Sequence, residues 1–245
     1  VLMSFSAFQN VLPDPNNTIG RAGQAAGNAG PGFATVKFTS EQPLLRDRTN
    51  SGRILARSIV AHRWKINITY NPMTRDEFEP VYSFLLHRRG AMSPFFVSLP
   101  QYRTPRNTTF ASYAASNSLE ATGAVAAGTT QALIAKSGYN NDTNSTPFPG
   151  DLFTINGTNS NHLKAYMVTR TERTGSGNYI SSLAQPSTNQ VRVHFTPGLS
   201  KAIGTGDDFV FHNPLIKVVT AGDIQEYTLN TNGLFQYSLN LEEVQ

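Results

Sequence analysis

Residues 63–70, RWKINITY, show the clearest alternation of hydrophobic and polar positions in the chain. Apolar side chains occupy every second position, and polar or charged side chains stand between them. A period of two is typical of an antiparallel strand with one buried and one solvated face. Pro72 cannot donate to a strand ladder, so we expect the strand to end before it. The apolar set is Trp64, Ile66, Ile68 and Tyr70, and the polar set is Lys65, Asn67 and Thr69.

A helix is predicted directly after this strand. Thr74 and Glu77, three positions apart, form the sequence signature of a capping box. Arg88 and Arg89 follow near the predicted C-terminus, where positive charge interacts favourably with the negative end of the helix dipole. Gly90 is placed for a left-handed C-cap. Pro80 lies too deep for the first turn, so it should kink the helix or delay its start. The predicted apolar stripe comprises Phe78, Val81, Tyr82 and Leu85.

Short strands separated by turn residues fill most of the remaining chain. Hydrophobic residues make up 39% and charged residues 15%, which suits short strands better than a helical bundle. The predicted fold class is therefore mainly β with one short helix. We expect a β-barrel or sandwich scaffold of residues 1–106 plus 213–245, interrupted by an inserted small β-barrel or sandwich over residues 107–212. The further predicted strands are 33–38, 54–60, 92–102, 151–156, 164–170, 189–195, 208–212, 214–219 and 235–244.

Residues 16–32 are rich in Gly, Ala and Asn and are predicted as an ordered loop or a mobile arm. Their glycines lack the G-x-G-x-x-G spacing, and no strand-like run precedes them, so we expect no dinucleotide turn. No window approaches the roughly 18 consecutive apolar residues of a membrane span, which predicts no membrane insertion. The first residues lack the pattern of a signal peptide, which favours synthesis in a cytoplasm.

The sequence shows few of the residue patterns that are typical of catalytic or metal-binding sites. It has no cysteine, and its five histidines show no short ligand spacing, so we expect neither a metal site nor a cofactor. Asp207 and Asp208 are adjacent and would point to opposite faces of a strand, so they cannot form the carboxylate pair of a glycosidase. Asp208 is better explained as a residue that enters a strand from a turn. Ser176, in TGSGN, lacks the G-x-S-x-G pattern. We expect a protein that is not an enzyme.

Charge is distributed unevenly along the chain. Residues 44–106 hold eleven Lys or Arg against four Asp or Glu, a balance of +7 within a total of +4. This asymmetry is compatible with nucleic-acid binding, with a solvated basic surface, or with copies that meet positive face to negative face in a ring. The candidate residues for such a subunit interface are Arg88, Arg89, Arg103 and Arg106 on the positive side and Glu242 and Glu243 on the negative side.

Several motifs resemble tail proteins of tailed bacteriophages. In that family a strand beginning with Trp precedes a short helix, a FLLxxRG element and a PFxVxLP strand. Here these elements correspond to RWKINITY, FLLHRRG (residues 84–90) and PFFVSLP (residues 94–100). The resemblance covers residues 60–105 and 149–245 and leaves the first sixty residues unmatched. Further similar phrases are PGDLFTIN, KAYMVT, VHFTPGLSKAI, FHNP and the closing LEEV.

This resemblance implies a structural virion protein of the phage tail or baseplate, made in the host cytoplasm. The outer domain would have the tail-tube or distal-tail β-fold with an inserted β domain. Copies would form a ring around the tail channel, a hexamer or alternatively a trimer, and would join the tube to baseplate components. The implied partners are therefore the chain itself and other tail or baseplate proteins.

Two other functions remain open from the sequence. The inserted domain could be a carbohydrate-binding module that contacts a host-surface glycan through aromatic side chains and Asn/Thr-rich loops. The basic block of residues 44–106 could bind nucleic acid, but no interleaved basic and aromatic motif is present, so we expect no sequence-specific binding. The aromatic candidates for glycan stacking are Tyr102, Phe110, Tyr113, Tyr139 and Phe148.

Overall fold

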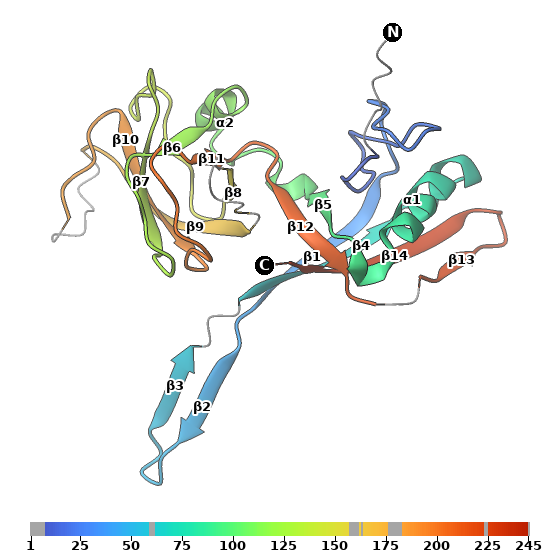
Figure 1. The fold of residues 1–245 in the computed structure, drawn as a ribbon, viewed down its shortest axis with the longest axis horizontal. Coiled ribbons are helices and arrows are strands. Elements are labelled where there is room, and N and C mark those ends of the chain that lie inside the picture. Colours follow the sequence, from blue (N-terminus) through green and yellow to red (C-terminus); the bar gives the residue numbers. More distant parts are fainter. Residues whose placement is uncertain are drawn as a thin grey trace. The chain divides into compact units, whose positions relative to one another are not determined.

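The computed structural model describes residues 8–58, 62–156, 162, 164–175, 183–222 and 225–244. Strands dominate this part of the chain, which confirms the predicted mainly β fold class (Figure 1). Ser176 and the last two residues of the predicted strand 54–60 lie outside the described residues. The chain divides into two compact units: Val1–Val97 with Lys217–Val244 form the first, and Ser98–Ile216 the second.

The first unit is built on one sheet with the strand order β1-β4-β14-β12-β5, in which β13 also pairs with β14. The β1–β4, β4–β14 and β12–β14 pairs are antiparallel. A separate two-stranded hairpin of β2 and β3 extends from it. The strands are β1 (Phe33–Glu41), β2 (Leu44–Arg48), β3 (Ile54–Ser58), β4 (Arg63–Tyr70), β5 (Phe95–Ser98), β12 (Leu215–Thr220), β13 (Tyr227–Leu229) and β14 (Phe235–Glu243); the helices are α1 (Arg75–Arg88) and the 3-10 turn η1 (Gly90–Met92).

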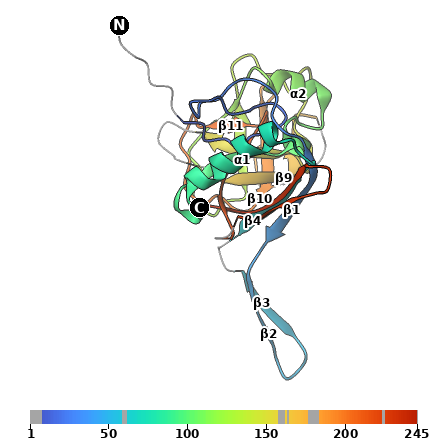
Figure 2. The same cartoon turned by 90° about the vertical axis from the view of Figure 1, so that its right-hand side faces the viewer.

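The alternating segment 63–70 is β4, and the structure confirms its two faces. The predicted apolar set is buried, whereas Arg63 and Lys65 are exposed. Helix α1 covers the buried face, as its aromatic contacts show: Phe78 stacks on Phe235 with ring centroids 4.6 Å apart, and Phe84 meets Phe95 at 5.3 Å (Figure 2). The period of two in the sequence arises because α1 buries one face of β4 and leaves the other face open to solvent.

Helix α1 has the predicted capping box and differs from the prediction at its C-terminal end. The Glu77 carboxylate accepts hydrogen bonds from the Thr74 backbone N–H (2.9 Å) and hydroxyl (2.8 Å), which lowers the pKa of Glu77. The helix starts directly after Thr74, so Pro80 lies inside it and does not delay its start. The left-handed C-cap is Arg89, with φ 53°, and the predicted cap Gly90 follows with φ 64°. The FLLHRRG element thus ends the helix one residue earlier than expected.

The second unit contains a closed barrel with the strand order β10-β7-β6-β11-β8-β9. Its core is a cluster of aromatic and branched side chains, in which Phe153 contacts Tyr166, Phe195 and Phe209. Helix α2, capped by the Asn107 side chain, is a second α-helix, whereas the sequence predicted a single helix for the whole chain. The elements are η2 (Pro100–Tyr102), α2 (Thr108–Ala114), β6 (Leu119–Ala121), β7 (Gln131–Ala135), β8 (Leu152–Asn156), β9 (Ala165–Glu172), β10 (Gln190–Thr196) and β11 (Asp208–Val210).

Two further features of the fold are the path of residues 16–32 and the ends of the barrel unit. The glycine-rich residues 16–32 form an ordered loop, closed by antiparallel bridges between Asp14 and Asn17 and between Ile19 and Ala25. In the second unit the incoming and outgoing chains lie side by side, because the Asn213 backbone N–H donates to the Arg103 carbonyl at 2.7 Å. The chain therefore enters and leaves the barrel unit at neighbouring positions.

Candidate subunit-interaction surfaces

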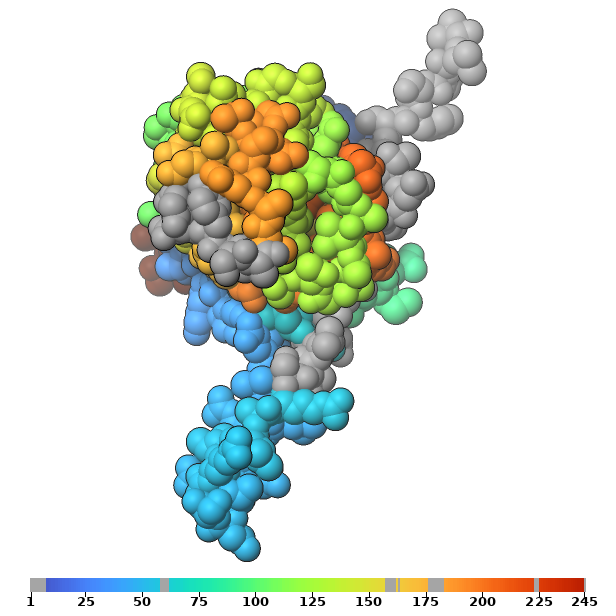
Figure 3. Space-filling view, turned by 90° about the vertical axis from the view of Figure 1, so that its left-hand side faces the viewer, coloured from blue at the N-terminus to red at the C-terminus, as the bar shows by residue number. Residues whose placement is uncertain are grey.

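The hairpin of β2 and β3, residues 44–58, is a solvent-exposed arm. Its strands pair in antiparallel register from Leu44 opposite Ser58 to Arg48 opposite Ile54. Figure 3 shows the exposed side chains of this arm in blue and cyan. An isolated two-stranded hairpin with exposed apolar residues gains little from burial, so it is a natural site for contact with a partner. The exposed apolar residues are Leu44 (42%), Leu45 (59%), Ile54 (60%) and Leu55 (48%).

The turn of the arm is held by local hydrogen bonds. The Thr49 N–H donates to the Arg53 carbonyl at 3.0 Å, and the Arg53 N–H donates to the Thr49 hydroxyl at 3.1 Å. Gly52 adopts φ 82°, a left-handed conformation that favours glycine. The tip is therefore structured while both strands expose their side chains.

The arm is also basic. It carries Arg46, Arg48, Arg53 and Arg57 against one acid, Asp47. More than a third of the cations in the predicted basic block 44–106 are thus on one exposed hairpin. The sequence prediction placed a strand at 54–60 but did not recognise its partner strand or the arm.

Strand β1 provides a second candidate surface. It is nine residues long, mostly exposed, and ends the strand order of the sheet. No strand pairs with its outer edge among the residues the structure describes. A long open edge presents unpaired N–H and C=O groups to which another chain can add a strand.

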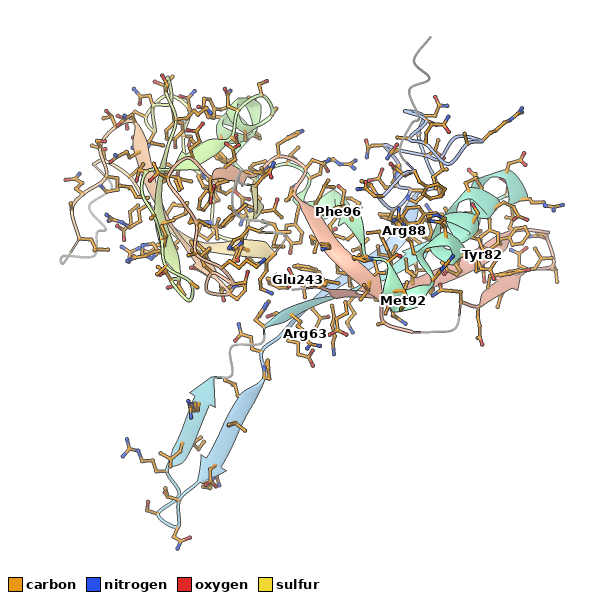
Figure 4. The ribbon with its side chains drawn as sticks, in the orientation of Figure 1. Arg63, Tyr82, Arg88, Met92, Phe96 and Glu243 are labelled. Atoms are coloured by element: carbon orange, nitrogen blue, oxygen red, sulfur yellow. The ribbon has the colours of Figure 1, made fainter. Side chains whose placement is uncertain are left out.

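The sheet face opposite α1 is polar, and two of its cations form ion pairs within the chain. Lys65 contacts Glu41 at 2.9 Å, and Arg63, labelled in Figure 4, forms an ion pair with the predicted interface residue Glu242. The hydrogen bond from Arg63 to Glu242 raises the pKa of Arg63. Glu242 is therefore already engaged by a cation of its own chain.

Glu243, the other predicted acidic residue, is buried. Its carboxylate accepts a hydrogen bond from the Trp64 backbone N–H at 3.3 Å. Alternation along β14 explains the difference between the two glutamates, because neighbouring residues on a strand point to opposite faces. Glu243 thus contributes to the interior of the first unit.

Arg88 is also directed inward, with 9% of its surface exposed (Figure 4). Its guanidinium donates to the Gln9 carbonyl and lies over the Phe84 ring, 4.7 Å from the ring centroid. Burial lowers the pKa of Arg88. The sequence contained a signal for this position, because Phe84 and Arg88 are four residues apart and share one face of the helix.

The three remaining arginines occupy separate places. Arg89 is exposed at the end of α1. In the second unit, Arg103 is half-buried and its side chain donates to Ser98 and Asn213, whereas Arg106 is exposed and donates to the Pro149 carbonyl. The six predicted interface residues therefore differ in exposure, and of these six only Arg89 and Arg106 are exposed.

The structure offers little for chemistry or for glycan stacking. Within the described ranges, no group of three or more His, Cys, Asp or Glu is placed to hold a metal ion. Asp208 starts β11 after a turn, as predicted. Of the aromatic glycan candidates, Phe110 and Tyr139 are core residues and only Phe148 is a large exposed hydrophobic residue. No described helix is long and apolar enough to cross a membrane.

Comparisons with known proteins agree with the sequence motifs. Residues 12–102 match the family model described as the N-terminal part of the A domain of distal tail protein pb9. This match extends into the first sixty residues, which the motif comparison had left unassigned. The chain is 28% identical over 225 residues to distal tail protein pb9 of Escherichia phage T5, covering 87% of this chain and 93% of that protein. The resemblance to phage tail structural proteins is thus confirmed, and the chain is similar to a phage distal tail protein.

Proposed function

We propose that this protein is a structural component of a phage virion, located in the tail, whose copies form a closed ring around the tail channel. The ring joins the tail tube to baseplate components, and hexamers are the expected assembly, with trimers as the alternative. The observation that carries this proposal is the exposed apolar arm of residues 44–58. The similarity to a distal tail protein supports the location.

Ring closure requires a head-to-tail contact, in which one surface of each copy meets a different surface of the next. The arm and the open edge of β1 are two exposed surfaces of the first unit that are available for contact with other copies. The charged candidates stay a prediction, and their exposure makes Arg89 and Arg106 the ones to test. Arg88 is unsuitable for a test by charge reversal, because its burial would couple the change to folding.

Removal of the arm tests the proposal. Residues 44–58 are replaced by a short Gly-Ser turn, and both proteins are examined by negative-stain electron microscopy and by light scattering after size-exclusion chromatography. We expect rings with six-fold or three-fold symmetry for the natural sequence and monomers for the variant. Circular dichroism should be little changed, because the arm is solvent-exposed. Rings formed equally well without the arm, or monomers of the natural sequence at every concentration, would contradict the proposal.

Carbohydrate binding by the inserted domain stays a prediction. Direct binding of the chain to a glycan array tests it, and the burial of Phe110 and Tyr139 gives it no support. The structural role in the tail is the function that the surfaces favour.

A further inference from the structure

Exposed hydrophobic residues gather at two places in the first unit. Of the ten large hydrophobic residues exposed in the described part of the chain, four are on the arm. Three more lie on α1 and β13: Leu86 (53%), Tyr227 (47%) and Leu229 (58%). Two apolar surfaces in one unit raise the question of whether they fit each other.

The second surface is continuous between helix and strand. The rings of Tyr82 and Tyr227 lie 5.5 Å apart, which joins α1 to β13 (Figure 4 labels Tyr82). Tyr82 and Leu86 are four residues apart on one side of the helix, and Tyr227 and Leu229 alternate onto one side of the strand. We call this surface the acidic–aromatic face: Glu79, Tyr82 and Leu86 of α1 with Glu226, Tyr227 and Leu229.

The charges of the two surfaces are opposite. Glu79 lies in the second turn of α1, and Glu226 directly precedes β13; both are exposed. Arg75 is the basic residue at this end of the helix, and it pairs with Glu79 at 3.3 Å. The arm, by contrast, has four arginines and one aspartate. Complementary charge selects partners and fixes their register more than it adds affinity.

One side of the arm matches the acidic–aromatic face better than the other. Residues directly opposite in an antiparallel pair share a side, and so do alternate residues along each strand. The register therefore places Leu44, Arg46, Arg48 and Ile54 on one side, and Leu45, Asp47, Leu55 and Arg57 on the other. The first side combines apolar and basic residues without an acid, so it is the complement of a surface that combines apolar and acidic residues.

The arm of the same copy is poorly placed to reach this face. The arm leaves the sheet where Glu41 pairs with Arg63, at one end of the β1–β4 ladder. The acidic–aromatic face belongs to the other end, where Met73 bridges Phe235 at the start of β14. The eight residues of β4 separate the two ends by about 23 Å. A second copy is therefore the better source of the arm.

We propose that the Arg46 and Arg48 side of the arm of one copy docks on the acidic–aromatic face of a second copy. Because the two surfaces differ, each copy can donate one arm and receive another, which is the head-to-tail contact of a ring. The inference rests on the proposed function and identifies the surface that receives the arm.

Disulfide trapping tests this contact, and the absence of natural cysteines makes the chain suited to it. The full-length double variant Ile54→Cys/Leu229→Cys is oxidised under assembly conditions and analysed on a non-reducing gel. The matched control is Leu55→Cys/Leu229→Cys, in which the arm cysteine lies on the other side of the hairpin. A disulfide forms only between cysteines whose Cβ atoms point toward each other, and Ile54 and Leu55 point to opposite sides of the hairpin, so the two sides of the arm can be distinguished. The linked peptides are identified by mass spectrometry.

The expected result is a ladder of covalent multimers for Ile54→Cys/Leu229→Cys and a loss of that ladder in the control. In the cysteine-free chain, Arg46→Glu/Arg48→Glu should raise the concentration at which copies assemble about tenfold, and Glu79→Arg/Glu226→Arg should restore assembly in that variant. Rings that form without a disulfide in the Ile54→Cys/Leu229→Cys variant would overturn the docking surface and leave the proposed ring intact. A chain that stays monomeric at every concentration would overturn both.

Discussion

Glu172, at the end of β9, is the most completely buried carboxylate among the described residues, with no exposed surface. Its oxygens accept from Arg192 at 2.9 Å and from His194 at 2.9 Å, and Arg170 contacts it at 3.2 Å. Burial alone raises the pKa of Glu172, but the hydrogen bonds from Arg192 and His194 together lower it below its ordinary value. A buried carboxylate kept charged in this way depends on its partners.

Replacement of this carboxylate should destabilise the barrel unit. We expect Glu172→Gln to cost about 3 kcal/mol at neutral pH, because it leaves the Arg192 charge buried without its acid. A lowered folded pKa means that the stabilisation is present above the ordinary value of 4.5 and is lost as pH falls through the folded value. Denaturant unfolding at neutral and acidic pH measures the difference in free energy of unfolding between the natural chain and the variant. This difference should be smaller at acidic pH.

Glu120→Gln is the control, since its ion pair with Lys136 is partly exposed and should contribute less than about 1 kcal/mol. Equal losses in the two variants would contradict the special role of the buried cluster.

At the scale of elements, prediction from sequence succeeded where a strand or helix buries one face. Segment 63–70 alternates because α1 covers one side of β4, and the strand boundaries were predicted accordingly. Segment 44–48 has adjacent leucines and no buried face, so it carries no alternation to detect. Strand β7 of the barrel was also missed, because Ala132, one of its two inward residues, is small and the outward residue Leu133 is apolar, which weakens the alternation.

The capping box of α1 gives a testable value for one of these local signals. We expect Thr74→Ala to destabilise the first unit by about 1 kcal/mol, because it removes the hydroxyl that donates to Glu77. Ser83→Ala, on the exposed side of the same helix, should change the free energy of unfolding by less than about 0.5 kcal/mol. Chemical denaturation followed by circular dichroism compares the two. If both variants unfold together with the natural chain, the cap contributes nothing measurable.

At the scale of the whole molecule, the site was harder to predict than the fold. Charge counting located the basic block but could not show that Arg88 and Glu243 point inward, because both orientations depend on long-range packing. The arm is a candidate contact surface because its side chains are exposed. Hydrophobic periodicity indicates which residues are buried, so it does not identify a segment without neighbours. We propose that the two compact units are independent folding domains, since each has its own buried core.

Excision of the second unit tests this division. A fragment of residues 98–216 should fold alone and unfold cooperatively, because its barrel is closed and its ends lie side by side at Arg103 and Asn213. Dispersed amide signals in a two-dimensional NMR spectrum are the expected result. A collapsed spectrum without dispersion would show that the barrel depends on the rest of the chain.

The hydrogen bond between Arg103 and Asn213 has an evolutionary consequence. A segment whose entrance and exit are neighbours can be lengthened, exchanged or deleted without a change in the path of the strands around it. Selection can therefore change the barrel as one unit, at a rate set by the molecules that the barrel contacts. The proposed ring would constrain the surfaces of the sheet that neighbouring copies contact, so we expect these surfaces to diverge more slowly.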